Sequence, residues 1–428
     1  MSWVIFFREK RDRMREYVRM KKALIITTIS GFVPQFEKNN VTLLQDMGYE
    51  VHYASNFNHP VYDYDNNFFQ KRNIITHQLL IEKSPRHILN NGKAFMQLKQ
   101  LLMKERFDLI HCHNPMGGVL GRLAAGFFSP SSTLLYTAHG FHFYRKAPWK
   151  NWLLYYPVER ALAHLTDILI TINREDYERG CSFHLKRGGS VWKIPGVGLD
   201  VDRFSPREEK KVERKKWLGF PPDSFLILSV GELNRNKNHS AVIQTIARME
   251  EKDIYYGICG RGYRQKKLQR LIEKEGLTGR VKLLGYRKDI DQVLPAADCF
   301  LFPSRREGFG MAAVEAMAVG LPLITSDCRG TREYMEDGVT GIVCDRNCPV
   351  GYIQAIRKLE NDSETRRRMG LAGREKSLLF STEATESVMR QIYLEAAKMR
   401  ESRIEERVEK RDSPVLSAKT DSSKNVKA

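Results

Sequence analysis

The chain has 428 residues, of which 42% are hydrophobic and 28% are charged, and it carries a formal net charge of +19. This length is more than one ordinary hydrophobic core accommodates, and it predicts two domains of about 200 residues each. No apolar stretch is long enough to span a membrane, and the seven cysteines form no Cys-x-x-Cys pair, which is typical of a protein from a reducing cytoplasm.

A basic segment precedes the first apolar stretch. Residues 1–19 contain many arginines, and the sequence Met20-Lys-Lys-Ala-Leu-Ile-Ile that follows has the character of a domain start. We interpret residues 1–19 as a basic N-terminal extension. It is either an added amphipathic segment or the product of a start codon placed too far upstream.

Short apolar segments rich in β-branched residues alternate with helical stretches along the whole chain, and each is a predicted strand. In the first half they are 23–29, 49–54, 77–81, 107–113, 133–137, 167–172 and 191–195, and in the second half they are 225–230, 254–259, 281–284, 299–302, 321–325 and 340–344. Strands separated by helices favour right-handed βαβ units with parallel sheets. Two such series in succession predict an α/β protein with two Rossmann-like domains.

Composition sets the predicted domain boundaries. A charged stretch and Pro221-Pro222 indicate a linker between the two series of strands, and Ser/Lys-rich sequence from Ser413 indicates disorder near the C-terminus. The predicted organisation is a first domain over 20–200, a linker over 201–222, a second domain over 223–380, a helix over 381–400 and a charged, disordered tail over 401–428.

The most informative motif is a pair of glutamates eight residues apart, Glu307 and Glu315. They lie in the sequence PSRREGFGMAAVEAM, which follows a predicted strand. Gly308 and Gly310 allow the backbone to approach a ligand closely, and a helix beginning near Met311 offers free N–H groups and a positive dipole end to an anion. The carboxylates can accept hydrogen bonds from hydroxyl groups. A nucleotide sugar combines both features, so it is the predicted ligand.

This segment resembles the Glu-x7-Glu signature of retaining glycosyltransferases of the GT-B fold, family four, and the resemblance extends over residues 23–397. The sequences VGELNRNKNH at 230–239 and TAHGFHFY at 137–144 are similar to those of enzymes that build bacterial exopolysaccharide or capsule repeat units. The resemblance implies two Rossmann-like domains with parallel sheets facing a central cleft. It also implies that the second domain binds the donor and that the helix over 381–400 crosses back to the first domain.

The resemblance further implies catalytic roles for three residues. Lys237 neutralises the donor diphosphate, His139 contacts the donor sugar, and Glu307 meets the sugar hydroxyls or the positive charge that develops at the anomeric carbon. Glu315 binds the ribose. Many relatives carry arginine where this chain has Glu232, and Arg235 is a candidate replacement for the missing cation.

Other residues occupy loop positions that contact donor or acceptor in such enzymes. Ordinary turns and helix packing explain most of these residues about equally well, and both readings stay open from sequence. The predicted donor contacts, besides Glu315, are Gly31, Gly260, Gly262, Tyr286, Arg287, Gly308, Phe309, Gly310 and Met311, and the predicted acceptor-side residues are Asn173, Glu175 and Trp149.

No metal or cofactor is expected besides the nucleotide sugar, which is a co-substrate. The two Asp-x-Asp sequences, at 63–65 and 200–202, do not follow strands, and His111 and His113 lack a carboxylate neighbour in sequence. The net charge of +19 suits peripheral association with an anionic membrane surface, and the alternative is that much of this charge is solvated surface. No nucleic-acid-binding motif is present, so nucleic acid is not an expected partner.

These features predict a cytoplasmic enzyme working at the inner face of the cell membrane. We expect it to move a sugar, with retention, from a UDP-sugar to a lipid-linked or saccharide acceptor during exopolysaccharide, capsule or other cell-surface glycan synthesis. One alternative is a sugar-nucleotide 2-epimerase of the same fold. Another is a non-catalytic subunit that binds nucleotide sugar, which the departure at Glu232 keeps open.

Overall fold

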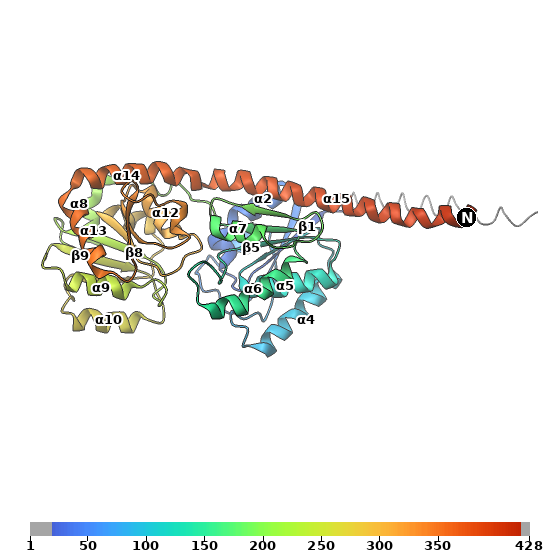
Figure 1. The fold of residues 1–428 in the computed structure, drawn as a ribbon, viewed down its shortest axis with the longest axis horizontal. Coiled ribbons are helices and arrows are strands. Elements are labelled where there is room, and N and C mark those ends of the chain that lie inside the picture. The colour runs from blue at the N-terminus through green and yellow to red at the C-terminus, as the bar shows by residue number, and fades with distance from the viewer. Residues whose placement is uncertain (1–18, 421–428) are drawn as a thin grey trace, which may run out of the picture. The chain divides into compact units, whose positions relative to one another are not determined.

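The computed structural model describes residues 19–420, and it divides the chain into two compact units (Figure 1). Residues 1–18, which hold nearly all of the predicted basic extension, and residues 421–428 lie outside the described residues. The first unit comprises Met1–Thr171, Arg179–Trp192 and Glu386–Ala428, and the second comprises Ile172–Glu178 and Lys193–Thr385.

A seven-stranded sheet forms the centre of the first unit, with the order β3-β2-β1-β4-β5-β6-β7. The pairings from β3 to β6 are parallel. Residues 23–26 of the central strand are wholly buried, as expected for a parallel strand covered on both faces. The strands are β1 (Lys21–Ile26), β2 (Tyr49–Ser55), β3 (Ile75–Gln78), β4 (Leu109–His113), β5 (Thr133–Ala138), β6 (Ile168–Thr171) and β7 (Ser190–Lys193).

Helices connect these strands, and one of them packs unusually close to the sheet. In α5, a Cβ at Gly118 would lie 2.4 Å from the Tyr136 ring, and one at Gly121 would lie 2.5 Å from Cys112 Sγ, so only glycine allows this distance. The helices of the first unit are η1 (Val33–Glu37, a π-helical turn), α2 (Lys38–Asp46), α3 (Phe68–Lys71), α4 (Ile88–Lys104), α5 (Pro115–Phe128) and α6 (Trp149–Ala163); α7 (Arg174–Cys181) is shared between the two units.

The second unit has a six-stranded sheet with the order β10-β9-β8-β11-β12-β13, whose pairings are all parallel. Its strands are β8 (Phe225–Val230), β9 (Ile254–Cys259), β10 (Val281–Gly285), β11 (Cys299–Phe302), β12 (Leu323–Ser326) and β13 (Gly341–Cys344). Every predicted strand is therefore present, and the predicted α/β fold with two Rossmann-like sheets is confirmed. The strand order reverses between β1 and β4 and between β8 and β11, which is where such sheets bind ligands.

Helices also flank the sheet of the second unit. They include the short helix that follows the Glu307 loop and a long pair near the end of the unit. They are η2 (Glu208–Lys210), α8 (Lys211–Trp217), α9 (His239–Ala247), α10 (Gln265–Lys274), α11 (Ile290–Val293), η3 (Leu294–Ala296), α12 (Met311–Ala318), η4 (Thr331–Glu333), α13 (Pro349–Asn361), α14 (Ser363–Ser377) and η5 (Leu378–Phe380).

The predicted linker over 201–222 is wrong, because the chain joins the second unit at Lys193 and forms α8 within that range. Lys215 explains the difference. Its side chain is buried, and its Nζ lies 2.8 Å from Asp298 Oδ2. This ion pair holds α8 to the segment that precedes β11. The stretch is therefore a helix of the second unit, in which Lys215 is buried while Glu213 and Lys216 are exposed.

The last helix, α15 (Thr382–Thr420), extends past the predicted end at residue 400. From Glu386 on it belongs to the first unit, where the Thr133 hydroxyl donates to the Ala396 carbonyl at 2.9 Å. Arg400 pairs with Asp108 at 2.5 Å, and Arg403 pairs with the buried Asp167. These ion pairs hold helical residues beyond 400, where the sequence predicted a disordered tail. None of the described helices is both long enough and apolar enough to cross a bilayer.

Candidate active site

Two loops of the second unit bring the predicted catalytic lysine and glutamate together. Lys237 lies in the loop after β8 and Glu307 in the loop after β11, and Lys237 Nζ is 2.8 Å from Glu307 Oε1. The ammonium also lies 4.5 Å from the centre of the Phe302 ring. The two side chains are 18% and 11% exposed, so the pair is shielded but remains accessible from solvent.

Hydrogen bonds fasten these two loops to each other. The Arg305 amide donates to the Asn236 carbonyl at 2.8 Å, and the Asn236 side chain donates to the Arg306 carbonyl at the same distance. The Arg305 guanidinium donates to Asn238 Oδ1 at 3.1 Å. Because both ends of the contact are fixed in this way, the Lys237–Glu307 geometry is preorganised.

Gly310 is the N-cap residue of α12 and has the left-handed conformation, and its carbonyl accepts from the Ala313 amide at 3.0 Å. Its φ is 99°, and a Cβ there would lie 2.8 Å from the Phe302 ring and 2.9 Å from the Tyr334 hydroxyl. Only glycine fits this position, which agrees with the predicted anion site at the N-terminus of α12. Met311, the first residue of the helix, is half-buried.

Glu315 lies one turn further along α12, and it is half-buried. Within the described part of the chain, no hydrogen bond or ion pair reaches its carboxylate. Burial raises its pKa from the usual 4.5 to about 7. A carboxylate kept without a partner at this cost is suited to accept hydrogen bonds from ligand hydroxyls.

Phe309 has a buried side chain, and its predicted contact with the donor stays a prediction. It is 4% exposed, and its ring packs 5.6 Å from that of Tyr334 and 5.2 Å from that of Phe380. Any contact from this position therefore comes from the backbone. Its role is to anchor the loop between Gly308 and Gly310 in the core.

Asn173 is not an acceptor contact, because all of its polar side-chain groups are used inside the second unit. It is wholly buried, it accepts from the Asp176 amide at 2.9 Å, and its own amide donates to Asp176 Oδ2 at 2.8 Å and to the Gly308 carbonyl at 2.9 Å. Asn173 therefore caps α7 and holds the glycine loop. Glu175, which is half-buried, stays a prediction.

Sequence reasoning missed Arg329, which lies after β12. It is 6% exposed, pairs with Asp176 Oδ1 at 2.6 Å and donates to the Glu307 carbonyl at 3.3 Å. The hydrogen bond from its guanidinium therefore helps to fix the backbone of Glu307. The only sequence signal is an arginine just past the end of an apolar strand, and such an arginine is usually exposed.

Gly260 and Gly262 are explained by close backbone contact. A Cβ at Gly260 would lie 1.9 Å from the Gly231 carbonyl oxygen, and one at Gly262 would lie 2.5 Å from that of Leu233. These glycines let the loop after β9 pack on the loop that leads to Lys237. Donor contact by either glycine stays a prediction.

The side chains of Tyr286 and Arg287 make contacts within the second unit. Arg261 lies over the Tyr286 ring at 4.5 Å. Arg287 forms two hydrogen bonds with Asp289, at 2.8 and 2.6 Å, and lies over the Trp217 ring. The guanidinium of Arg287 is therefore engaged, so the predicted contact with a nucleotide base would come from the backbone.

Glu232 stands where many relatives carry an arginine, and the contacts of its loop do not identify a replacement for that positive charge. Glu232 is exposed and accepts a hydrogen bond from Asn234 at 2.9 Å. Arg235 is also exposed, and its backbone amide donates to the Tyr263 hydroxyl at 3.2 Å. That Arg235 supplies the positive charge missing at position 232 stays a prediction.

In the first unit, His139 follows β5, and Phe32 and His113 pack against its ring. His139 Nε2 lies 3.1 Å from His113 Nδ1, and the Phe32 ring is 4.9 Å from that of His139, edge-on. Burial lowers the pKa of His139 to about 4, so the imidazole is neutral at physiological pH. His111 is wholly buried and binds Thr137 and Tyr393, so it belongs to the core of the unit.

Glu37 is a second residue that the sequence did not single out. It is 2% exposed, and its Oε1 lies 3.4 Å from His113 Nδ1. With His113 and His139 it forms the one group of described residues whose donor atoms are close enough to share a metal ion. His113 Nδ1 and His139 Nε2 are also within hydrogen-bonding distance of each other, at 3.1 Å.

Gly31 and Trp149 differ in accessibility. The Gly31 amide donates to the Pro60 carbonyl at 3.2 Å, and a Cβ would lie 2.6 Å from that oxygen. Packing therefore explains this glycine, and its predicted contact with the diphosphate cannot use the amide. Trp149 is 69% exposed at the start of α6 and is available to a partner.

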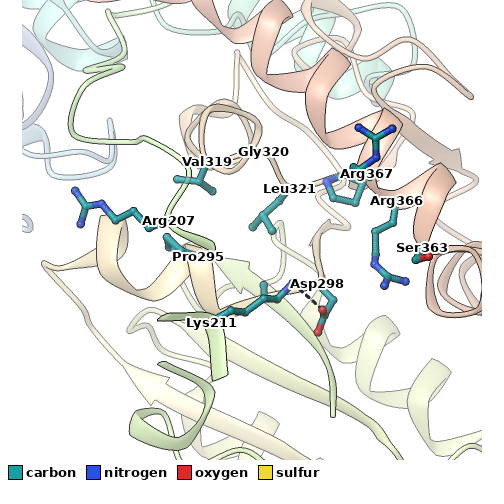
Figure 2. A pocket seen from close by; sticks show the side chains of 12 residues that line it. Arg207, Lys211, Pro295, Asp298, Val319, Gly320, Leu321, Ser363, Arg366 and Arg367 are labelled. Atoms are coloured by element: carbon teal, nitrogen blue, oxygen red, sulfur yellow. Dashed lines mark ion pairs between the residues drawn. The ribbon is translucent and has the colours of Figure 1, made fainter. Parts of the chain in front are cut away.

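A separate pocket of the second unit contains none of the predicted site residues (Figure 2). Its lining includes Pro295, Ala297 and Asp298 before β11 and residues 319–322 before β12, so it lies at the amino ends of these strands, opposite the Lys237–Glu307 pair. Lys211 and Asp298, which face each other in Figure 2, form an ion pair of 2.8 Å. We do not assign this pocket to the active site.

Two Rossmann-like units and a Glu-x7-Glu loop beside a lysine define the class of glycosyltransferases with the GT-B fold. The solved structure of HepE from Anabaena, in complex with UDP and glucose, has the same fold, with a TM-score of 0.71 at 18% identity, covering 88% of this chain and all of that one. Two family models match, "Glycosyl transferases group 1" over residues 210–376 and "Glycosyltransferase Family 4" over residues 39–192.

The chain is also similar to proteins of known name. EpsD from Bacillus subtilis, which is named as a glycosyltransferase, is 37% identical to this chain over 379 residues. The aligned residues cover 87% of this chain and 96% of EpsD. A UDP-Gal:α-D-GlcNAc-diphosphoundecaprenol α-1,3-galactosyltransferase from Escherichia coli is 30% identical over 280 residues, which cover 64% and 72% of the two chains. The chain belongs to glycosyltransferase family four and is an enzyme of that kind. These matches do not favour the 2-epimerase alternative.

Proposed function

We propose that this glycosyltransferase moves a sugar, with retention and without a metal, from a UDP-sugar to a lipid-diphosphate-linked saccharide for cell-surface glycan synthesis. The observation that carries the proposal is the Lys237–Glu307 pair, whose glutamate lies in the loop that leads to the N-terminus of α12. The names of two similar proteins support the chemistry. One uses UDP-Gal and a diphosphoundecaprenol acceptor, and the other holds UDP and glucose.

Each site residue has a defined task in this reaction. The amides of α12 and the Lys237 ammonium stabilise the charge that develops on the departing diphosphate. Glu315 binds the ribose hydroxyls, and Glu307, held by Lys237, faces the positive charge that develops at the anomeric carbon. From the first unit, His139 donates a hydrogen bond to the transferred sugar. The leaving phosphate takes the proton of the acceptor hydroxyl.

Donor profiling, in which the pure protein is incubated with UDP-, GDP- and dTDP-sugars one at a time, tests the proposal. We expect release of nucleoside diphosphate from one UDP-sugar, stimulated by a membrane lipid extract, and no release from GDP- or dTDP-sugars. Mass spectrometry of the lipid fraction checks for the product, and NMR of the new linkage checks for retention. Conversion of a UDP-sugar to its 2-epimer without acceptor, or an inverted linkage, would contradict the proposal.

The proposed acceptor requires contact with a membrane surface, and the first unit exposes apolar side chains beside lysines. On α4, Ile88, Leu89 and Met103 are 76%, 81% and 68% exposed, and on α6, Trp149 and Leu153 are each 69% exposed. Lysines lie beside them on both helices. This combination suits an interface with anionic lipid.

The variant Trp149→Glu/Leu153→Glu is therefore expected to bind vesicles of phosphatidylglycerol and phosphatidylcholine at least about 10-fold more weakly, since two apolar anchors are lost and two like charges are added. Vesicle co-sedimentation measures the effect. Leu371→Glu, at an exposed leucine of α14 in the second unit, is the matched control. Equal binding by the wild type and both variants would contradict a membrane contact through α6.

A further inference from the structure

A short piece of the first half of the sequence belongs to the second unit. The chain leaves the first unit at the end of β6, contributes Ile172–Glu178 to the second unit and returns to the first at Arg179. Asn173 and Asp176 lie in this inserted segment, and both side chains are buried. The second unit is therefore not complete with Lys193–Thr385 alone.

Asp176 connects two side chains that bind the loop carrying Glu307. Its Oδ1 lies 2.6 Å from Arg329 Nη1, and its Oδ2 accepts from the side-chain amide of Asn173 at 2.8 Å. The same amide group of Asn173 donates to the Gly308 carbonyl at 2.9 Å. Arg329 Nε donates to the Glu307 carbonyl at 3.3 Å. We call Asn173, Asp176 and Arg329 the loop clamp, because they bind two successive carbonyls of one loop.

The loop needs this support because glycine leaves its backbone free to rotate. Glu307 is followed by Gly308, and glycine restricts φ and ψ less than any other residue. The side chain of Asn236 binds the Arg306 carbonyl, and the loop clamp binds the Glu307 carbonyl, so the planar peptides on both sides of the Glu307 Cα are held. A Cβ at Gly330 would lie 2.8 Å from the Gly308 carbonyl carbon, so the chain after Arg329 also packs on this loop.

Arg329 and Asp176 form a buried ion pair, with side chains 3% and 1% exposed. Such a pair adds little net stability compared with apolar side chains of similar size. The planar guanidinium, however, presents several N–H donors in fixed directions, so it binds a carboxylate and a carbonyl at the same time. The geometry therefore suits orientation of the loop better than stabilisation of the fold.

We propose that Asn173, Asp176 and Arg329 are positioning residues that hold Glu307 in the orientation that sugar transfer requires. They act through the backbone of Glu307, while Lys237 holds the carboxylate end of the same residue. The kinetic consequence rests on the proposed function, whereas the fixing of the loop is a property of the unliganded protein.

The variant Arg329→Met/Asp176→Asn, the loop-clamp variant, removes the ion pair without leaving one charge buried alone. We expect kcat to fall about 10- to 100-fold, because a small displacement of a catalytic group has an effect of this size. The Kd and the stoichiometry of UDP binding should stay within about 2-fold of the wild type, since the contacts proposed for Glu315 and Lys237 do not involve the loop clamp. Loss of folded protein would lower the stoichiometry instead.

A second background shows whether the loop clamp acts through Glu307. We expect Glu307→Gln by itself to lower kcat. Adding the loop-clamp substitutions to Glu307→Gln should then lower kcat by less than about 3-fold more, because the group that they position is already lost. A role in stability alone predicts the same factor in both backgrounds.

The second unit also provides a matched control pair. Lys215 and Asp298 are buried, with Nζ and Oδ2 2.8 Å apart, and they hold α8 and not the Glu307 loop. Lys215→Met/Asp298→Asn therefore removes an equivalent buried ion pair from the same unit. We expect it to leave kcat within about 2-fold of the wild type.

Limited proteolysis of the full chain tests the loop itself, without any donor. Trypsin cleaves after arginine, and Arg305 and Arg306 immediately precede Glu307. We expect mass spectrometry to show cleavage at these two sites at least about 5-fold faster in the loop-clamp variant than in the wild type or the control variant, because the loop opens more often.

A lower kcat with unchanged UDP binding, little further loss in the Glu307→Gln background and faster cleavage support the proposal. It is overturned by a kcat of the loop-clamp variant within about 2-fold of the wild type, by equal factors in the two backgrounds, or by unchanged cleavage. Should the wild type turn over no donor, the proposed function fails, and the rate of cleavage alone decides whether the loop clamp fixes the loop.

Discussion

Replacing Lys237 by alanine is expected to lower kcat about 10²- to 10³-fold, which is the usual cost of removing one preorganised charge from a developing anion. The ammonium is held 2.8 Å from Glu307 and over the Phe302 ring, so it reaches the diphosphate without reorganising. Steady-state kinetics with the UDP-sugar identified by donor profiling measure the effect. We expect a smaller change in KM than in kcat, because the charge grows in the transition state.

The variant also leaves Glu307 without its partner, and a second variant separates the two effects. In Lys237→Ala/Glu307→Gln no buried charge is stranded, and we expect kcat to remain as low as in the single variant. Lys274→Ala, at the end of α10, is the matched control for loss of a lysine in the same unit. Turnover within about 3-fold of the wild type in Lys237→Ala would remove this residue from the mechanism.

Replacing Glu315 by glutamine is expected to stabilise the second unit at pH 8 while weakening UDP binding. Burial raises the pKa of Glu315 from 4.5 to about 7. A carboxyl whose pKa is higher in the folded state contributes stability below the unfolded pKa, and this contribution is lost as the pH rises through about 7. Glutamine carries no charge, so it avoids up to about 3 kcal/mol of this loss, from 1.36 kcal/mol per pKa unit.

Thermal unfolding at two pH values measures the stability effect. We expect the Tm of Glu315→Gln to exceed that of the wild type by about 4–8 °C at pH 8, with no difference near pH 4.5. Loss of the charged acceptor should raise the Kd for UDP about 10- to 100-fold. Glu273→Gln, at an exposed glutamate of α10, is the control. A higher Tm without weaker UDP binding would show that Glu315 does not bind the ribose.

The architecture was predictable from sequence because its signal is local. Buried parallel strands read as continuous apolar segments, so the position of each strand could be found without knowing its neighbours. The same holds for where the chain places the residues of the predicted donor site in the second unit. Lys237 and Glu307 follow strands, and Gly310 precedes the helix that carries Glu315 one turn further on, and the topology of parallel sheets gathers such positions at one edge.

The predictions for Asn173 and for residues 201–222 are wrong for one physical reason, namely that sequence does not show where a side chain points. Asn173 was read as an acceptor contact, but it turns inward to cap α7 and hold Gly308. Phe309 lies within the donor motif, but its ring fills the core. The charged stretch at 201–222 was read as a linker because the burial of Lys215 against Asp298 cannot be seen along the chain.

The sequence by itself determined the fold, the two series of strands and the motif that identifies a glycosyltransferase, since these depend on periodicity and on spacing between neighbours along the chain. Only the tertiary structure decided which groups support that motif. Arg329 reaches the Glu307 carbonyl from a loop 22 residues away, and Glu37 approaches His113 from the helical turn after β1, the strand next to that of His113. Contacts of this kind join residues that lie far apart in sequence, and their energies depend on burial and orientation, which the folded chain alone defines.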